Sequence, residues 1–578
     1  MCSSDLITLN LAAAASMVRA MNSTTNTILT RLSAELIEQY EAEGFWGGDT
    51  IYSLARWHAK RTPDAFAVRD CVRRISYQAL IESADALAAD LAARGLKPGQ
   101  RVAVWLPSRI EAVVTLLACS RNGYICAPSL HRDHTVGEVA ELLKRQRSAA
   151  FVVQSGYGAD TDKRDLDAAL KDVLSLRQVY RLGAMNGQET GAFAGVPQKS
   201  AEDVPQKTDP NQIVYLAFTS GTTGQPKGVM HSDNTLLANA KQLAKDWHID
   251  SRSVIYTLSP LSHNLGFGAQ VMALAVGGEL VLHDLPRGAS LADRIVETNT
   301  SFLVGVPVHA IDLLAEMKKR GLKGLGRLNG FRISGAAAPA DVVAGLIEQG
   351  IVPQSGYGMT ETCSHQYTLP NDDPKLIVET SGRACPGYEI RIFKSDDPDR
   401  EAPVGEIGQV GGRGASLMLG YFDDQTSTED SFNRDGWFMT GDLGSLDSNG
   451  YLRITGRKKD VIIRGGHNIY PARIEALALK HPAVERAAAV PVADARLGEK
   501  VCLAVMLRAG QTLTPDALLA HLDEAGLSKY DMPEFVLILD DIPLTANGKI
   551  RKIDIVADIK NGKLAPLPVR FEQKRASA

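Results

Sequence analysis

The run from Thr219 to Gly228 has the residue types that could surround a polyphosphate. Its sequence, Thr-Ser-Gly-Thr-Thr-Gly-Gln-Pro-Lys-Gly, follows an apolar, strand-like stretch at 213–218. Glycines let the backbone approach a ligand closely, while hydroxyl and backbone N–H groups bind phosphate oxygens and Lys227 adds a positive charge. The spacing between Gly224 and Lys227 differs from the common nucleotide P-loop, Gly-x-x-x-x-Gly-Lys-Ser/Thr. On composition alone, a flexible loop is the commoner structure for such a run.

Three further segments carry charged groups suited to the same ligand. Glu361, in Tyr-Gly-Met-Thr-Glu-Thr at 357–362, supplies a carboxylate of the kind that Mg²⁺ prefers. Asp442 ends the motif Gly-Trp-Phe-Met-Thr-Gly-Asp, and its two oxygens suit two vicinal hydroxyl groups. Lys549, in Thr-Ala-Asn-Gly-Lys-Ile, is a compact charge on a flexible stem. Each of these residues taken singly is equally typical of a solvated surface.

Three of the candidate loops directly follow strand-like runs. Besides the phosphate loop, the stretch 331–334 runs into Gly335-Ala336-Ala337-Ala338-Pro339, and 351–354 runs into Ser355 to Thr362. Open α/β sheets bind ligands beyond the carboxyl ends of their parallel strands. We therefore expect these loops to share one crevice.

The N-terminal third alternates between helical and strand patterns. Apolar residues from Ser76 onward recur with helical spacing, and Gly95 and Pro98-Gly99 end that helix. A buried strand at 102–106 and a second helix through about Asn122 follow. This alternation predicts a mostly parallel sheet flanked by helices. Phe45-Trp46 is expected to pin an N-terminal arm to the body.

Length and composition narrow the class of protein. A chain of 578 residues should form more than one domain, and its formal charge of −4 gives no electrostatic case for binding nucleic acid. Seven scattered cysteines without a Cys-x-x-Cys pair favour a reducing, cytoplasmic location. No apolar run reaches membrane-spanning length.

Five motifs resemble those of the acyl-adenylate-forming superfamily: the four given above and Lys-Lys-Asp-Val-Ile-Ile-Arg-Gly-Gly-His-Asn-Ile-Tyr-Pro at 458–471. They follow one another in the order expected for that superfamily. That superfamily contains acyl-CoA synthetases, aryl-acid adenylating enzymes, peptide-synthetase adenylation domains and beetle luciferases. The resemblance implies an α/β fold, with an AMP-binding domain of β-sheets flanked by helices over 1–456. A smaller mobile α+β domain would cover 457–578, with a hinge near Lys459. It also implies ATP, Mg²⁺ and coenzyme A as ligands, and it is compatible with a homodimer.

The same resemblance assigns roles to individual residues. Lys549 would bridge the substrate carboxylate and the α-phosphate, with Thr360 and Lys227 assisting, and Glu361 and Thr219 would hold Mg²⁺. The nucleotide would contact Thr219, Ser220, Gly221, Thr222, Thr223, Gly224, Lys227, Gly335, Ala336, Ala337, Tyr357, Gly358, Met359, Thr360, Asp442, Arg457 and Lys549. Among these, Tyr357 would lie on the adenine face and Asp442 on the ribose.

The acid and the thiol have their own expected sites. By resemblance, the acyl group would contact His263, Asn264, Phe267, Val306 and Gly335, and the pantetheine arm of CoA would pass Gly465, Gly466 and His467. The aspartate that peptide-synthetase domains carry near the position of Tyr215 has no clear counterpart, which argues against an amino acid.

The motifs favour a ligase that joins CoA to a small cyclic, aromatic or medium-chain acid. One alternative is an aryl-acid–AMP ligase that loads a separate carrier protein. A luciferase-like oxidoreductase is compatible with the fold alone, and an adenylate-binding protein without turnover is the last alternative. The intact Lys549 and Glu361 argue against the last of these.

Overall fold

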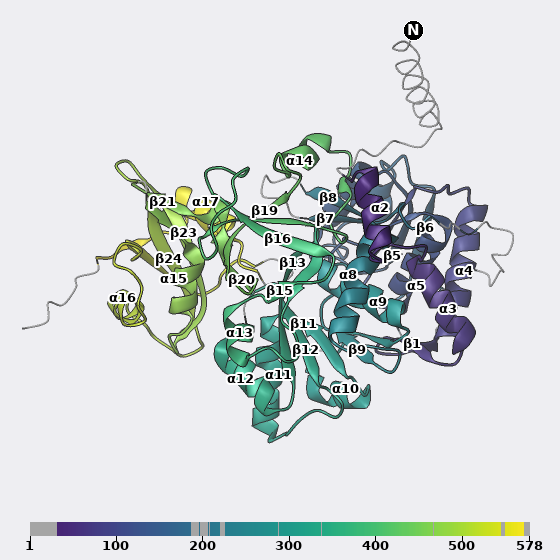
Figure 1. Cartoon of the computed structure of the whole chain (residues 1–578), viewed down its shortest axis with the longest axis horizontal. Helices are drawn as coiled ribbons and strands as arrows, with labels where there is room; N and C mark the ends of the chain where they lie inside the picture. Colours follow the sequence, from purple (N-terminus) through teal and green to yellow (C-terminus); the bar gives the residue numbers. More distant parts are fainter. Residues whose placement is uncertain are drawn as a thin grey trace, which may run out of the picture. The chain divides into compact units, whose positions relative to one another are not determined.

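The computed structural model describes residues 32–185, 193, 196, 206, 209–219, 226–286, 288–336, 338–465, 467–544 and 549–570. The chain forms two compact units (Figure 1). The first unit contains residues up to 378 together with 385–388 and 414–431. The second contains 379–384, 389–413 and the chain from 432 onward. Each unit is described by itself below.

The first unit contains two largely parallel sheets. One has the strand order β18-β8-β7-β4-β3-β5-β6, with β7–β8 and β8–β18 antiparallel. Its strands are β3 (Arg101–Trp105), β4 (Ile125–Ala127), β5 (Ser148–Gln154), β6 (Gln178–Leu182), β7 (Ile213–Thr219), β8 (Lys227–Ser232) and β18 (Gly420–Tyr421).

The other sheet has the order β14-β13-β12-β11-β9-β10-β1-β2, in which the β13–β14 and β1–β2 pairs are antiparallel. Its strands are β1 (Phe66–Arg69), β2 (Arg74–Ser76), β9 (Val254–Thr257), β10 (Glu279–Leu282), β11 (Phe302–Gly305), β12 (Gly330–Ser334), β13 (Val352–Met359) and β14 (Cys363–Tyr367).

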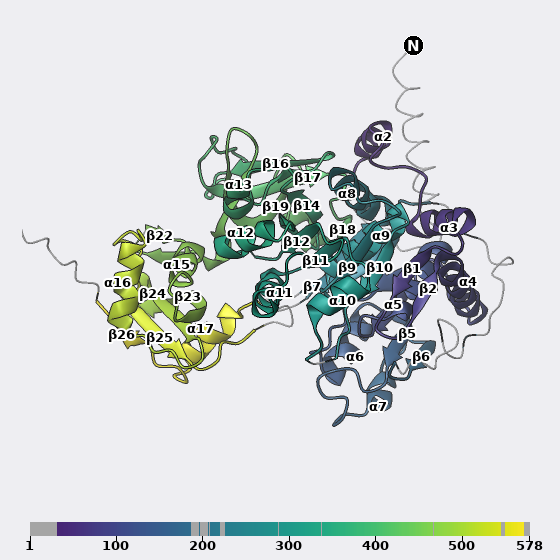
Figure 2. The same cartoon turned by 90° about the horizontal axis from the view of Figure 1, so that it is seen from below.

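Helices cover these sheets, and α8 and α9 pack side by side (Figures 1 and 2). The helices associated with the first unit are α2 (Ala34–Ala42), α3 (Ile51–Arg61), α4 (Tyr77–Ala93), α5 (Ile110–Asn122), α6 (Val136–Arg145), α7 (Leu166–Leu170), α8 (Asp233–Asp246), α9 (Asn264–Val276), α10 (Leu291–Glu297), α11 (Pro307–Arg320), α12 (Ala340–Glu348), α13 (Pro374–Glu379) and α14 (Gln425–Asp430).

The second unit contains an antiparallel sheet and a mixed α+β region. The antiparallel sheet has the order β16-β17-β19-β20, and the second sheet has the order β22-β21-β24-β25-β26 with β23 paired to β24. Its elements are β15 (Arg383–Ala384), β16 (Tyr388–Phe393), β17 (Gly408–Gly414), β19 (Phe438–Leu446), β20 (Leu452–Arg457), η1 (Lys458–Asp460), β21 (Ile462–Arg464), β22 (His467–Ile469), α15 (Pro471–Ala478), β23 (Val484–Asp494), β24 (Gly498–Leu507), α16 (Pro515–Glu524), β25 (Phe535–Leu539), α17 (Lys552–Lys560) and β26 (Leu567–Pro568).

The expected α/β architecture is confirmed, with several sheets in the larger part and an α+β region near the C-terminus. The domain boundary between 456 and 457 stays a prediction. The two compact units follow a different division, in which the sheet β16-β17-β19-β20 lies mostly in the second unit.

The helix predicted from Ser76 is α4, and its ends follow from local chemistry. The Ser76 hydroxyl accepts a hydrogen bond from the Ala79 N–H, which caps the helix. Leu80, Leu87 and other apolar residues of one face are fully buried. Gly95 ends the helix with φ +80°, a conformation that favours glycine.

The N-terminal arm is attached as the sequence predicts. Trp46 is buried, and its Nε1–H donates to the Ala415 carbonyl at 2.8 Å. The Phe45 ring lies against Gly387, where a Cβ atom would approach the ring to 2.8 Å. The arm is therefore held by packing and by one buried hydrogen bond.

The strand predicted before the phosphate loop is β7, whereas one other predicted strand–loop segment differs from the structure. The phosphate-loop motif lies between the antiparallel strands β7 and β8, and α8 begins only after β8. The segment predicted as a loop from Ser355 onward continues as strand β13 to Met359, because β14 turns back and pairs with it. The polar stretch predicted as a surface loop at 188–206 lies almost wholly outside the described residues.

No helix in the described part of the chain is long and apolar enough to cross a membrane.

A buried ionic cluster at the start of α5 gives a test of the fold. The Glu111 carboxylate accepts hydrogen bonds from Arg109 at 2.7 and 2.8 Å and from Arg73 at 2.9 Å. Burial alone would raise the pKa of Glu111, but the hydrogen bonds from the two guanidinium groups outweigh it and lower the pKa.

We expect Glu111→Gln to lower the free energy of unfolding by about 3 kcal/mol at neutral pH, because it removes the carboxylate that pairs with the buried Arg109 and leaves Arg73 with Asp70 alone. Since the folded pKa is lowered, this contribution is present above the unfolded pKa of about 4.3 and is lost as the pH falls below it. Urea unfolding at several pH values measures it. Glu141→Gln, which removes an exposed pair with Lys144, is the control; equal stability of the two variants contradicts the prediction.

Candidate active site

The β7–β8 hairpin brings the two ends of the phosphate-loop motif together. Thr219 and Lys227 are paired across the hairpin, and the Thr219 hydroxyl donates to the Lys227 carbonyl at 3.5 Å. The predicted phosphate contacts Ser220, Gly221, Thr222, Thr223 and Gly224 lie outside the described residues. The hairpin therefore fixes where the loop begins and ends.

Tyr421 connects the phosphate-loop hairpin to Glu361. Strand β18 places Tyr421 opposite Val229 of β8. The Tyr421 hydroxyl donates to Glu361 Oε1 at 3.0 Å, and Lys227 Nζ lies 4.7 Å from the centre of the Tyr421 ring. Burial is the larger cause and the negative charge of Glu361 the second cause of a raised pKa at Tyr421. The phenol therefore stays protonated and donates a hydrogen bond to Glu361.

Glu361 is 7% exposed, so it is not a solvated loop carboxylate. Two contacts fix the backbone at Thr360 and Glu361. Met418 N–H donates to the Glu361 carbonyl at 2.7 Å, and His231 Nε2 lies 2.7 Å from the Thr360 carbonyl oxygen. Burial lowers the pKa of His231 to about 4, so the neutral ring donates through Nε2. Thr360 and Glu361 are thus tied to the β8 strand that carries Lys227.

Strands β12 and β13 place the residues predicted to contact adenine. Gly335 and Ala336 directly follow β12, and the Ser334 hydroxyl donates to the Gly356 carbonyl at 3.0 Å. Tyr357 packs edge-on against His365, with ring centres 5.6 Å apart. Ala337 lies outside the described residues.

Gly358 has a structural reason to be glycine. A Cβ atom there would lie 2.0 Å from the Cys363 carbonyl oxygen, which belongs to the strand paired with β13. The close approach of the two strands therefore requires a residue without a side chain. It also holds the neighbouring Tyr357 and Met359 in strand conformation.

The residues predicted to contact the acyl group separate into different environments. Asn264 Nδ2 donates to the Met359 carbonyl at 3.3 Å, beside Thr360. His263 stacks on His131 with ring centres 4.1 Å apart, and Phe267 stacks on Tyr215 at 4.0 Å and is 1% exposed. Val306 N–H donates to His309 Nδ1 at 3.2 Å.

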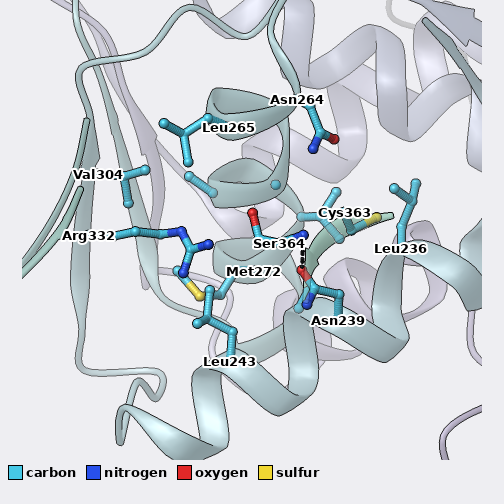
Figure 3. A pocket seen from close by; sticks show the side chains of 14 residues that line it. Leu236, Asn239, Leu243, Asn264, Leu265, Met272, Val304, Arg332, Cys363 and Ser364 are labelled. Atoms are coloured by element: carbon cyan, nitrogen blue, oxygen red, sulfur yellow. Dashed lines mark hydrogen bonds between the residues drawn. The ribbon is translucent and has the colours of Figure 1, made fainter. Parts of the chain in front are cut away.

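A small cavity of about 20 Å³ lies beside α8 and α9 (Figure 3). Its lining includes Asn264 but not the other four residues of the described chain that we predicted for the acyl group. Polar residues that the sequence reading did not single out also line it: Asn239, Arg332, Cys363 and Ser364. Gly266 lets the first turn of α9 lie against the backbone of Pro260, because a Cβ atom at position 266 would lie 2.3 Å from the Pro260 carbonyl oxygen.

In the second unit, four predicted residues come together. Asp442 and Arg457 are paired across β19 and β20, and Arg457 Nε lies 3.3 Å from Asp442 Oδ1. Lys459 follows in η1, where burial and then the charge of Arg457 lower its pKa. Although Lys549 is exposed as a residue, burial of its ammonium group and the charge of Arg457 lower its pKa, and Asp442 opposes this.

The residues predicted for the thiol lie in a separate turn of the second unit. Gly465 has φ +58° between β21 and β22, and its N–H donates to the Leu497 carbonyl at 2.8 Å. His467 is exposed and lies 2.9 Å from Asp531 through Nε2. Gly466 lies outside the described residues.

Tyr421 is a residue that sequence reasoning missed. Its contacts join Glu361 and Lys227, which are far from it in the chain. In the sequence, Tyr421 is marked only by the preceding Gly420, and this pair has no characteristic spacing to the phosphate-loop motif or to the 357–362 motif.

Comparisons with known proteins agree with these motifs. Residues 55–422 match the AMP-binding enzyme family, and residues 473–549 match the AMP-binding enzyme C-terminal domain. A medium-chain fatty-acid–CoA ligase of Escherichia coli K12 is 30% identical over 526 residues, covering 90% of this chain and 92% of the relative. A salicylyl-CoA synthase/salicylate adenylyltransferase of a Streptomyces species is 30% identical over 547 residues, covering 92% and 97%.

A crystal structure of ATP-bound MatB from Rhodopseudomonas palustris superimposes with a TM-score of 0.78 at 29% identity, covering 89% of this chain and 99% of that one. The chain therefore belongs to the AMP-binding enzyme family and, within it, to the AMP-forming acid:CoA ligases. The predicted superfamily and class of enzyme are thus confirmed.

We expect Tyr421→Phe to raise the MgATP concentration at half-maximal rate about tenfold, because a hydrogen bond to a buried carboxylate is lost while the ring beside Lys227 remains. Initial rates at varied MgATP measure this. Tyr180→Phe is the matched control, because the Tyr180 hydroxyl, in β6, also donates to a carboxylate, that of Asp90 at 2.7 Å. Indistinguishable MgATP dependence for Tyr421→Phe and wild type would show that the contact does not matter.

Proposed function

We propose that the chain activates a small cyclic, aromatic or medium-chain carboxylic acid and transfers its acyl group to CoA. The cluster formed by Lys227, Tyr421 and Glu361 carries this proposal, because it joins the phosphate-loop motif to the carboxylate of the 357–362 motif by direct contacts. The names of the two relatives, a medium-chain fatty-acid–CoA ligase and a salicylyl-CoA synthase, support this range of acids.

The first half-reaction is R-COO⁻ + ATP → R-CO-AMP + pyrophosphate. A carboxylate is a poor electrophile, and the mixed anhydride supplies a good leaving group. Several negative charges must be brought together, which requires positioned cations and N–H donors. In this proposal Lys227 contacts the phosphates, Lys549 bridges the acid and the α-phosphate, and Asp442 binds the ribose.

The residues present fit a magnesium ion. Glu361 offers a buried carboxylate oxygen and Thr219 a hydroxyl at the start of the loop, both hard ligands. Mg²⁺ bound there would neutralise phosphate charge. Among the described residues no group of three or more His, Cys, Asp or Glu could hold a metal, so phosphate oxygens would have to complete the coordination.

The second half-reaction is R-CO-AMP + CoA-SH → R-CO-S-CoA + AMP. We propose that Gly465, Gly466 and His467 line the path of the pantetheine arm, and that the C-terminal region pivots at Lys459 between the two steps. The runner-up function is an aryl-acid–AMP ligase whose acceptor is a separate carrier protein. A cytoplasmic location is part of the proposal and agrees with the free cysteines of the described residues.

A panel of acids tests the activity directly. AMP release should require ATP and an acid, and should be faster with free CoA than with a phosphopantetheinyl carrier protein. Octanoate, benzoate and cyclohexanecarboxylate represent the three classes. Faster transfer to the carrier protein would favour the runner-up, and pyrophosphate exchange that does not depend on any acid would refute acid activation.

Lys549→Ala tests the division of labour. We expect adenylation to fall by at least about 100-fold, because the developing charge between the acid and the α-phosphate loses its cation, while thioester formation from a supplied acyl-AMP is spared. Single-turnover assays of each half-reaction measure the two rates. Lys563→Ala removes an exposed lysine paired with Asp558 and serves as control. Equal loss of both half-reactions by Lys549→Ala would refute the separation.

A further inference from the structure

The cavity beside α8 and α9 contains a buried positive charge. Arg332, in the middle of β12, is 2% exposed and lines the cavity together with apolar side chains that include Leu243, Met272 and Val304. Figure 3 shows its guanidinium group pointing from the strand toward Ser364 and Met272. An arginine is an unusual residue at a position that is otherwise packed by hydrophobic groups.

The hydrogen-bonding capacity of Arg332 is only partly used. Its Nη1–H donates to the Gln354 Oε1 oxygen, while Nε and Nη2 have no hydrogen-bond partner in the described part of the chain. No carboxylate of the described residues forms an ion pair with it, and its Cζ atom lies 5.7 Å from the centre of the Tyr367 ring. The Nε2 amide of the buried Gln354 is also without a partner among described residues.

The space for this guanidinium group is built into the sheet. A Cβ atom at Gly356, on the adjacent strand, would lie 2.8 Å from Arg332 Nη2. Burial lowers the pKa of Arg332 to about 10, which still leaves the group charged at neutral pH. A buried charge without an ionic partner costs several kcal/mol. The fold therefore maintains an uncompensated cation that an anionic ligand would stabilise.

The same cavity reaches the segment where the acid is activated. Asn264 lines the cavity and also donates to the Met359 carbonyl, next to Thr360. The cavity-lining residues of α9 lie between Asn264 and Met272, whose positions are about 12 Å apart along the helix. An acid whose reacting carboxylate lies near Thr360 would therefore direct its other end toward Arg332.

We propose that the acid substrate carries a second carboxylate at the end remote from the activated one, and that Arg332 binds this second carboxylate. The inference rests on the proposed acid-activating function and specifies its substrate class. Two unused N–H groups on one guanidinium suit bidentate binding of a carboxylate.

Matched pairs of acids test this on the wild-type enzyme. Octanoate is compared with suberate, hexanoate with adipate, and cyclohexanecarboxylate with cyclohexane-1,4-dicarboxylate, by acid-dependent pyrophosphate exchange. We expect kcat/KM to be about 100-fold higher for the dicarboxylate in at least one pair, as for a buried charge pair. A higher value for the monocarboxylate in every pair overturns the inference.

Arg332→Met, which keeps the length of the side chain without its charge, separates recognition from folding. We expect kcat/KM for the preferred dicarboxylate to fall about 100-fold, with an unchanged or higher value for its monocarboxylate and no loss of thermal stability. Arg327→Met, at an exposed position just before β12, is the matched control. Equal loss for both acids of a pair would indicate a structural role and overturn the inference.

Failure of this inference differs from failure of the proposed function. Activation of monocarboxylates alone, with ATP and CoA, leaves the acid:CoA ligase proposal intact and removes the role of Arg332. Absence of exchange with every acid of the panel refutes both.

Discussion

The hydrogen bond from Tyr421 to Glu361 is the contact on which the arrangement of the β7–β8 hairpin and the 357–362 motif depends. It joins a short strand, β18, to a buried turn after β13, and β18 in turn pairs with the strand that carries Lys227. A buried carboxylate and an ammonium group are thereby held on one rigid framework. Rigid placement matters because charges positioned before reaction need no rearrangement as the transition state forms.

The contacts around His231 and Met418 add to the same constraint. Each uses a backbone group of the Thr360-Glu361 turn, so the turn is held independently of the side chains that would contact a ligand. The residues that could bind phosphate and metal are consequently supported by hydrogen bonds that no ligand has to replace. In the second unit, Asp442 and Arg457 are supported in a comparable way by the pairing of β19 and β20.

Much of the local fold could be predicted from sequence because it is encoded locally. Ser76 and Gly95 mark the ends of α4 through a side-chain cap and a positive φ, and helical spacing identifies its buried face. The β7–β8 hairpin could not be recognised, because a glycine-containing loop after a strand is compatible with a following helix and with a returning strand. The pairing partner, not the loop, decides which one forms.

The same distinction separates the site residues that could be predicted from those that could not. Glu361 and Asp442 lie in contiguous motifs, whereas Tyr421 acts through a contact across 60 positions of the chain. Gly358 belongs to a recognisable motif, but the sequence could not show that it serves the close approach of two strands. Phe267, expected beside the acyl group, stacks on the fully buried Tyr215, a contact that the sequence could not show.

The buried arginines of the first unit provide an internal comparison. Arg109 is fully buried, and it is matched by the carboxylate of Glu111, the Gln154 side chain and the Gly183 carbonyl. Arg332 is buried to a similar degree, yet its described surroundings offer one amide oxygen and an aromatic ring. If both residues served only the fold, the desolvation cost of the second would have no compensation, and a neutral side chain of similar length would be more stable at that position. Within the described part of the chain, the contrast between these two arginines is the observation behind the proposal that Arg332 binds an anionic group of the substrate.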